Sequence, residues 1–186
     1  KAGTRYASHD LINTENVTQL QQAWVTRTNQ PGRFSGTPLQ IKDGLYLCTS
    51  QNIIISLDPD TGAERWRFDP KNETPYFSLL GNCRGVTYFE VPEIPEGQLC
   101  KERIFTATTD ARLIAVDMKT GKPCLDFGES GQISLLAGMG EVKPYYYFVT
   151  SPATVASGSL VVGGWVMDNQ ETEEPSGVVR AYDPVS

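Results

Sequence analysis

Residues 44–66, GLYLCTSQNIIISLDPDTGAERW, decide the fold. They align without a gap with residues 103–125, RIFTATTDARLIAVDMKTGKPCL. Each copy has two β-branched or aromatic runs separated by a short polar turn, then the pattern Asp-x-x-Thr-Gly. The aspartates, Asp58 and Asp117, both stand 14 residues after the start of their copy. Self-similarity at a fixed period indicates a repeat architecture.

A third copy is split by an insert. It begins at Ser159 with SLVVGGWV, resumes at Gly177 with GVVRAYDPVS and reaches its aspartate at Asp183. This aspartate comes 24 residues after the start instead of 14, so the acid-rich insert is ten residues long. The insert enters where the other copies make a tight turn between two strands.

Each copy is expected to form a β-hairpin followed by a turn and a further strand. The aspartate can accept backbone N–H bonds, and Gly62 and Gly121 can take a positive φ. Trp66 then returns an indole to the sheet, where it can wedge between neighbouring units. Trp24 resembles the closing residue of a preceding unit.

In the second copy, Cys124 or Leu125 stands near the tryptophan position, so we expect a degenerate wedge there. Four-stranded sheets repeated with tryptophan wedges predict an all-β fold, a partial β-propeller of about three blades. The alternative is a two-sheet sandwich with chance similarity. A short helical turn is expected within TENVTQLQQAW, with Thr14 as its cap and Val17, Leu20 and Trp24 on one face.

The composition limits the possible partners. The net charge is −6 and the pI is about 4.8, which argues against nucleic acid as a ligand. No apolar run approaches the roughly 18 residues that a membrane span needs. The chain opens without a signal-peptide pattern, so we expect a mature segment or a piece of something longer.

The cysteines leave one pairing open. With a single histidine and no Cys-x-x-Cys, a zinc site is not expected. Cys48 and Cys124 are expected to be buried as small hydrophobic residues. Cys83 and Cys100 flank the excursion VPEIPEGQ and could form a disulfide or remain free. A disulfide would imply an oxidising compartment.

The turn pattern resembles the tryptophan-docking repeat of quinoprotein dehydrogenases, which use pyrroloquinoline quinone. Nearly the whole chain is similar to their membrane-bound glucose dehydrogenase branch, which includes quinate/shikimate and polyol dehydrogenases. The resemblance implies that residues 1–186 form the N-terminal, incomplete part of an eight-bladed propeller domain. The stretches that carry it are RYASHDLINTENVTQLQQAW, TPLQIKDGLYLCTSQNIIISLDPDTGAERWRFDP, NCRGVTYFE, RIFTATTDARLIAVDMKTGKPCLDFGESG, TSPATV and SGVVRAYD.

The resemblance implies an enzyme that oxidises a sugar or polyol hydroxyl, with glucose to gluconolactone as the first expectation. Electrons would pass to pyrroloquinoline quinone and then to ubiquinone, at the periplasmic face of the bacterial inner membrane. A Ca²⁺ or Mg²⁺ ion would act as a Lewis acid. The alternatives are a quinate/shikimate or polyol dehydrogenase, or a non-catalytic propeller scaffold that binds partner proteins.

The fragment alone is expected to be inactive, because the catalytic carboxylate would lie beyond Ser186. We also expect its open sheet edges to allow self-association. A transmembrane tether is implied by the family but is not found in this chain.

The resemblance also implies cofactor-binding residues. Arg84, in CRGV, stands where the family has an arginine beside the quinone, and a guanidinium binds carboxylates well. Phe89 stands where glucose dehydrogenases have a histidine; phenylalanine can stack on a ring but cannot hydrogen-bond to a sugar. The alternatives are a surface arginine and a core aromatic residue.

Two hydroxyl residues complete the implied cofactor site. Ser35 replaces a glutamate that many relatives have near the quinone, so it can donate a hydrogen bond but brings no charge. Thr150, in VTSPATV, matches a position whose hydroxyl can bind a cofactor carboxylate. A plain turn is the alternative for Thr150.

Asp168 and Asn169 match an Asp-Asn pair that the family places after a Gly-rich strand end. Carboxylate and amide oxygens are the ligands that hard cations prefer, so we expect this pair to bind the metal ion. The alternative is a solvated polar loop, which is what the acidic residues after the pair are expected to form.

Overall fold

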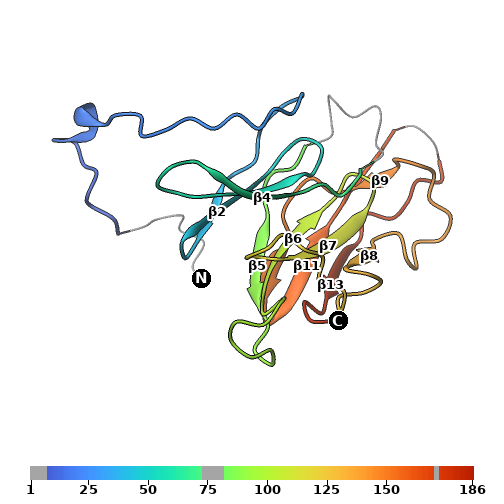
Figure 1. The fold of residues 1–186 in the computed structure, drawn as a ribbon. Coiled ribbons are helices and arrows are strands. Elements are labelled where there is room, and N and C mark those ends of the chain that lie inside the picture. Colours follow the sequence, from blue (N-terminus) through green and yellow to red (C-terminus); the bar gives the residue numbers. More distant parts are fainter. Residues whose placement is uncertain (1–7, 73–81, 170–171) are drawn as a thin grey trace.

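The computed structural model describes residues 8–72, 82–169 and 172–186. These residues form three antiparallel blade sheets that follow one another along the chain, and a separate two-stranded sheet (Figure 1). Blade 1 consists of β1 (Leu39–Ile41), β2 (Gly44–Cys48), β3 (Ile54–Leu57) and β4 (Glu64–Phe68). Blade 2 consists of β5 (Thr87–Glu90), β6 (Glu102–Ala107), β7 (Arg112–Asp117) and β8 (Gln132–Ser134). Blade 3 consists of β10 (Thr154–Ala156), β11 (Ser159–Gly163) and β13 (Val179–Tyr182).

The repeat predicted from the sequence is confirmed. The aligned copies form the hairpins β2–β3 and β6–β7, and the split third copy pairs β11 with β13. The insert between them contains β12 (Trp165–Val166), which pairs with β9 (Tyr147–Phe148). Every residue of β6 is buried, because neighbouring blades cover both faces of the middle sheet. This stack of sheets is the partial propeller that the Asp-x-x-Thr-Gly spacing predicted.

The loops at the two ends of the blades have different roles. Because the strands alternate in direction, β2, β4, β6 and β11 all end where β1, β5 and β10 begin; we call this the loop end. The turns that follow Asp58, Asp117 and Asp183 lie at the opposite end, which we call the docking end. The first strands of blades 2 and 3 lie next to each other, and Thr87 Oγ1 donates to Ala153 O at 2.6 Å.

The tryptophan wedges are confirmed at the docking end. Trp66 leaves blade 1 in β4 and donates from Nε1 to Met118 O of blade 2 at 3.1 Å. Trp24 makes the same contact on blade 1, donating to Pro59 O at 2.9 Å. Each indole covers the glycine of the turn so closely that a Cβ on Gly62 or Gly121 would overlap the ring.

The turn aspartates organise the surface on which the indoles dock. Asp58 Oδ1 accepts from the backbone N–H of Asp60 and Thr61 and from the Thr61 hydroxyl at 2.9–3.1 Å. Asp117 does the same in blade 2. Hydrogen bonds from Arg65 and Thr61 lower the pKa of Asp58 to about 2. The carboxylate therefore keeps its charge, and its hold on the turn, at any ordinary pH.

At the third turn, an arginine supplies the hydrogen bonds that the indoles supply elsewhere. Arg103 is fully buried and donates from Nη1 to Pro184 O at 3.2 Å and to Val185 O at 3.0 Å. Pro184 follows its turn aspartate directly, as do Pro59 and Met118 in the other turns. Of the residues expected at the degenerate wedge, Cys124 is held in a disulfide and Leu125 is 71% exposed. The Arg103 guanidinium supplies the donor in place of an indole.

The cysteine pairing differs from the one considered from the sequence. The disulfides are Cys48–Cys83 and Cys100–Cys124, with Cα atoms 5.8 and 5.6 Å apart. Cys83 and Cys100 do not pair, because β5 carries the chain from the loop end to the docking end between them. The expected burial of Cys48 and Cys124 is correct. Closing loops of 35 and 24 residues should contribute roughly 3.5 kcal/mol each to stability.

The expected helical turn is confirmed only in part. Val17–Gln19 form a single 3-10 turn, η1, and its N-cap is Asn16 rather than Thr14. Val17 and Leu20 are exposed, so of the expected apolar face only Trp24 packs against a described element. Residues 20–31 after η1 have no regular secondary structure, and Trp24 docks from this segment. Among the described residues, no helix is long and apolar enough to cross a membrane.

Replacing Trp66 with phenylalanine should lower the free energy of unfolding by about 2 kcal/mol. The ring would still cover Gly121, but the bond to Met118 O would be lost and a small cavity would form. Trp165→Phe is the matched control, because Trp165 is 43% exposed and its ring stacks on Phe148 rather than on a turn glycine. Urea unfolding measures both; equal midpoints for the two variants would contradict the docking role.

Candidate functional site

Three short loops meet at the loop end, one before the first strand of each blade. They are residues 35–37 before β1, 83–85 before β5 and 150–152 before β10. Thr37 N donates to Arg84 O, and Arg84 N donates to Thr150 O, both at 2.9 Å. Main-chain hydrogen bonds thus run from blade to blade and fix the three loops relative to one another.

A glycine and a disulfide bring blades 1 and 2 close together at this point. A Cβ on Gly36 would lie 3.0 Å from Cys48 O and 3.2 Å from Cys83 O, so the loop passes against both cysteines. The Cys48–Cys83 bond ties the end of β2 to the loop that carries Arg84. Both cysteines are buried, so the covalent link lies beneath the loops.

The structure brings three of the predicted cofactor residues together in these loops. Ser35 and Arg84 are exposed, whereas Thr150 is 7% exposed. A guanidinium and two hydroxyls, one from each of three blades, form a donor set suited to a ligand that carries carboxylates. The set spans the region where the first strands of the blades converge.

Asn82 was missed by the sequence analysis. It directly precedes Cys83, and its Oδ1 is buried and accepts no hydrogen bond. A buried acceptor without a donor costs roughly 1–3 kcal/mol, which makes Asn82 a candidate for accepting a bond from a bound group. In the sequence, only its position next to Cys-Arg-Gly indicated that Asn82 could belong to the cofactor site.

Phe89 does not join this group. It lies in β5, five residues beyond Arg84, opposite Arg103. Its partly buried ring packs against the core cluster that includes Phe105, Phe127 and Leu160, between blades 2 and 3. A cofactor platform at Phe89 stays a prediction, and this packing favours the alternative of a core aromatic residue.

Asp168 and Asn169 also lie apart from the three loops. β12 pairs with β9 so that Val166 opposes Tyr147, and Met167 N donates to Tyr146 O at 3.0 Å. The Asp-Asn pair follows directly, alongside the chain before β9 rather than beside Thr150. Both residues are exposed, and Asn169 has a φ of +61°. The backbone pairing thus places the pair beside the chain that leads into β9.

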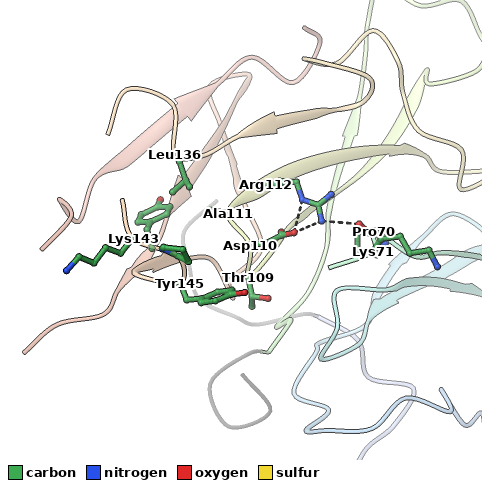
Figure 2. Close-up of a pocket in the computed structure, with 11 residues that line it drawn as sticks. Pro70, Lys71, Thr109, Asp110, Ala111, Arg112, Leu136, Lys143 and Tyr145 are labelled. Atoms are coloured by element: carbon green, nitrogen blue, oxygen red, sulfur yellow. Dashed lines mark hydrogen bonds and ion pairs between the residues drawn. The ribbon is translucent and has the colours of Figure 1, made fainter. Parts of the chain in front are cut away.

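A cavity of about 470 Å³ opens at the loop end, beside the β6–β7 turn of blade 2 (Figure 2). Its walls are the β6–β7 turn at 109–112, the segment 143–147 before β9, and Pro70 and Lys71 after β4. Lys143 Nζ lies 5.7 Å from the centre of the Tyr146 ring.

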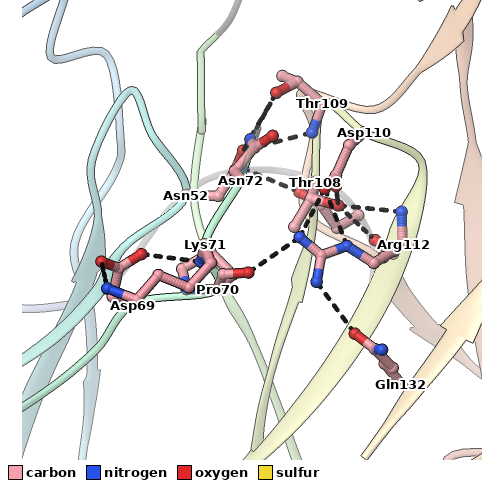
Figure 3. Close-up of polar contacts among 11 residues, drawn as sticks. Asn52, Asp69, Pro70, Lys71, Asn72, Thr108, Thr109, Asp110, Arg112 and Gln132 are labelled. Carbon is pink, nitrogen blue, oxygen red and sulfur yellow. Dashed lines mark hydrogen bonds and ion pairs between the residues drawn. The ribbon is translucent and has the colours of Figure 1, made fainter. Parts of the chain in front are cut away.

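Arg112 in this cavity has a structural role (Figure 3). It forms an ion pair with Asp110 at 2.5 Å, and it donates to Gln132 Oε1 at 3.1 Å and to Pro70 O at 3.0 Å. These bonds join blade 1 to blade 2 and leave little of the guanidinium for a ligand. Buried Asn52 strengthens the same junction by donating to Ala107 O at 3.2 Å.

One cluster in the described part of the chain has the spacing of a metal site. It consists of Cys100, Cys124 and Asp126, at the docking end. The two sulfurs form a disulfide and therefore offer no thiolate to a metal. Arg103 Nη2 donates to Asp126 Oδ2 at 2.5 Å, so the carboxylate already has a cationic partner.

Comparison with known proteins gives a consistent result. The family model described as "PQQ: Glucose/ethanol/alcohol dehydrogenase, beta-propeller domain" matches residues 1–186. The chain is 41% identical to the glycerol dehydrogenase large subunit of Gluconobacter oxydans (strain 621H) over 98% of its length. It is 38% identical to quinoprotein glucose dehydrogenase A of Acinetobacter calcoaceticus over 98% of its length. It is 35% identical to quinate/shikimate dehydrogenase (quinone) of Acinetobacter baylyi over 99%. The chain covers 26%, 25% and 25% of these relatives.

Solved structures support the fold. Quinohemoprotein alcohol dehydrogenase from Comamonas testosteroni superposes with a TM-score of 0.72 and 24% identity, covering 97% of this chain and 24% of that one. A europium-containing methanol dehydrogenase superposes with a TM-score of 0.71 and 23% identity, covering 97% of this chain and 28% of that one. At these identities the likeness shows the fold alone.

Proposed function

Because the chain belongs to the glucose/ethanol/alcohol dehydrogenase β-propeller family of pyrroloquinoline quinone enzymes, we propose that the whole protein oxidises a hydroxyl group of a small sugar or polyol. The meeting of three loops at the loop end carries the proposal. Glycerol and glucose are the first substrates to test, since relatives named for them are 41% and 38% identical to this chain. Quinate or shikimate is the alternative, supported by a relative at 35% identity.

The residues present fit a quinone cofactor that carries three carboxylates. Arg84 would orient one carboxylate through paired N–H donors, and the Thr150 and Ser35 hydroxyls would donate to others. The buried Asn82 Oδ1, which has no partner of its own, would accept from the cofactor or the substrate. When bound, the quinone supplies the two-electron acceptor that protein side chains lack.

Asp168 and Asn169 are the proposed ligands of a Ca²⁺ or Mg²⁺ ion. Their exposed oxygens suit a hard cation, and two protein ligands are too few for the six to eight that Ca²⁺ takes. The remaining ligands and the catalytic carboxylate would come from other parts of the whole protein. We therefore expect the 186-residue chain to be inactive by itself.

The location and the final electron acceptor are also proposed. Two disulfides indicate that the protein folds in an oxidising compartment, which supports the periplasm. Ubiquinone in the adjoining membrane would then receive the electrons.

The function is tested by reconstituting the whole protein with pyrroloquinoline quinone and Ca²⁺ or Mg²⁺. We expect an artificial dye to be reduced when glycerol or D-glucose is added, with no reduction before the quinone is added. The 186-residue chain under the same conditions is the negative control. Failure with glycerol, D-glucose and quinate alike would contradict the proposal.

Replacing Asp168 with alanine in the whole protein should raise the Ca²⁺ or Mg²⁺ concentration for half-maximal activity by at least tenfold. The reason is that one charged ligand of the cation is removed. Glu173→Ala is the matched control, because it deletes an exposed carboxylate from the same insert. An equal metal requirement in both variants would show that the insert is a solvated loop.

A further inference from the structure

A second cavity lies at the docking end, away from the three loops. It has a volume of about 420 Å³ and opens between blades 1 and 2. Small-molecule sites in proteins begin at roughly 300 Å³. β2 spans five residues between the two ends, or about 15 Å, so one small molecule cannot contact both regions. The cavity lies between two blades that each have four strands. All the residues that line it belong to the described part of the chain.

Its floor is a row of side chains across blade 1. Ser56 on β3 pairs with Tyr46 on β2 and with Trp66 on β4, so the three side chains share one face of the sheet. The two aromatic rings flank the serine, with their centres 6.0 Å apart and their planes at 41°. Two ring faces with a hydroxyl between them suit a ligand that is both apolar and hydroxylated.

The Ser56 hydroxyl is the feature that indicates a ligand. Ser56 is 1% exposed, and its Oγ has no hydrogen-bond partner. Burial raises the pKa of Tyr46 and the nearby Ser56 hydroxyl offsets part of that rise, but no hydrogen bond of acceptable geometry joins the two hydroxyls. A buried polar group without a partner is costly, and Ser56 is one of the residues that line the cavity.

The charged groups around the cavity are already paired. Glu102, at 4% exposure, binds Lys42 Nζ at 2.6 Å and accepts from Tyr88 OH at 3.0 Å. Burial and the neighbouring Glu102 raise the pKa of Tyr88, which keeps it protonated as a donor. Lys119 Nζ lies 3.8 Å from Glu102.

Arg65 is likewise neutralised, by Asp43 at 3.1 Å and Asp58 at 2.7 Å. The cations Lys42, Lys119 and Arg65 are thus matched by the carboxylates of Glu102, Asp43 and Asp58. With neither sign in excess, the cavity favours a neutral ligand over an anion or a metal ion.

We propose that this cavity is a second binding site, which takes a small neutral polyhydroxy molecule of the monosaccharide or polyol class. A ligand hydroxyl pairs with Ser56, while others accept from the exposed Lys42 and Lys119 ammonium groups at the rim. The C–H face of the ligand packs against the rings of Tyr46 and Trp66. Because the ligand contacts both blades beside the Trp66 dock, its binding stabilises their junction.

The test follows the tryptophans by ¹⁹F NMR in protein labelled with 5-fluorotryptophan. D-glucose and glycerol are titrated separately, and Trp66→Phe assigns the Trp66 signal. The proposal expects a saturable shift of the Trp66 signal with at least one probe. Trp24 is the internal control, since it docks in the same way but beside an apolar groove, and its signal should stay in place.

The variant Ser56→Ala tests whether the ligand binds in this cavity. It should weaken binding about three- to tenfold, the effect of losing one hydrogen bond, and raise the melting temperature of the ligand-free protein by removing the orphan hydroxyl. Thr106→Val is the matched control, a buried strand hydroxyl outside the cavity. Lys42→Met removes one proposed donor at the exposed rim and also one ion-pair partner of Glu102, so its unfolding midpoint is measured beside its binding.

Two results would overturn the proposal. The first is a Trp66 signal that neither probe shifts saturably, which would mean that the cavity holds only solvent. The second is a shift whose half-saturation is the same in the original protein, Ser56→Ala and Lys42→Met, which would place the ligand elsewhere.

Discussion

The structure depends on one contact, in which a side-chain N–H from one segment donates to the backbone of the next blade's Asp-x-x-Thr-Gly turn. Trp24 and Trp66 make it to Pro59 O and Met118 O. The aspartate in each turn holds its backbone N–H groups inward, and the glycine makes room for the ring. Since an indole has a single N–H donor, the bond fixes the register of adjacent blades as well as their packing.

The register of the blades determines how the loops are arranged at the loop end. Each blade begins with a strand that starts at the loop end, so the loops before β1, β5 and β10 come together only if the blades are correctly aligned. The bonds from Thr37 to Arg84 and from Arg84 to Thr150 join those loops, and the Cys48–Cys83 disulfide secures the first pair. The donor set proposed to bind the quinone is thus a product of packing at the far end of the blades.

The features that could be predicted from the sequence are those formed by residues close together in the chain. The hairpins, the turns of Asp58 and Asp117 and the docking of Trp66 could be predicted because each rests on residues close together in the chain. The disulfides could not, because strand direction separates Cys83 from Cys100. The role of Arg103 was also hidden, since a buried arginine that bonds Pro184 O depends on the approach of two blades. The orphan acceptor of Asn82 could be recognised only once its surroundings were known.

The central claim is that docking at one end fixes the loops at the other. Amide hydrogen exchange at Thr37 and Arg84 tests it, because these N–H groups form the bonds between the loops. The rates should be compared between the original protein and Trp66→Ala, under conditions where both remain folded. The account predicts faster exchange at Thr37, whose bond links blades 1 and 2, while the Arg84 bond to blade 3 is less affected. Unchanged exchange at Thr37 would contradict it.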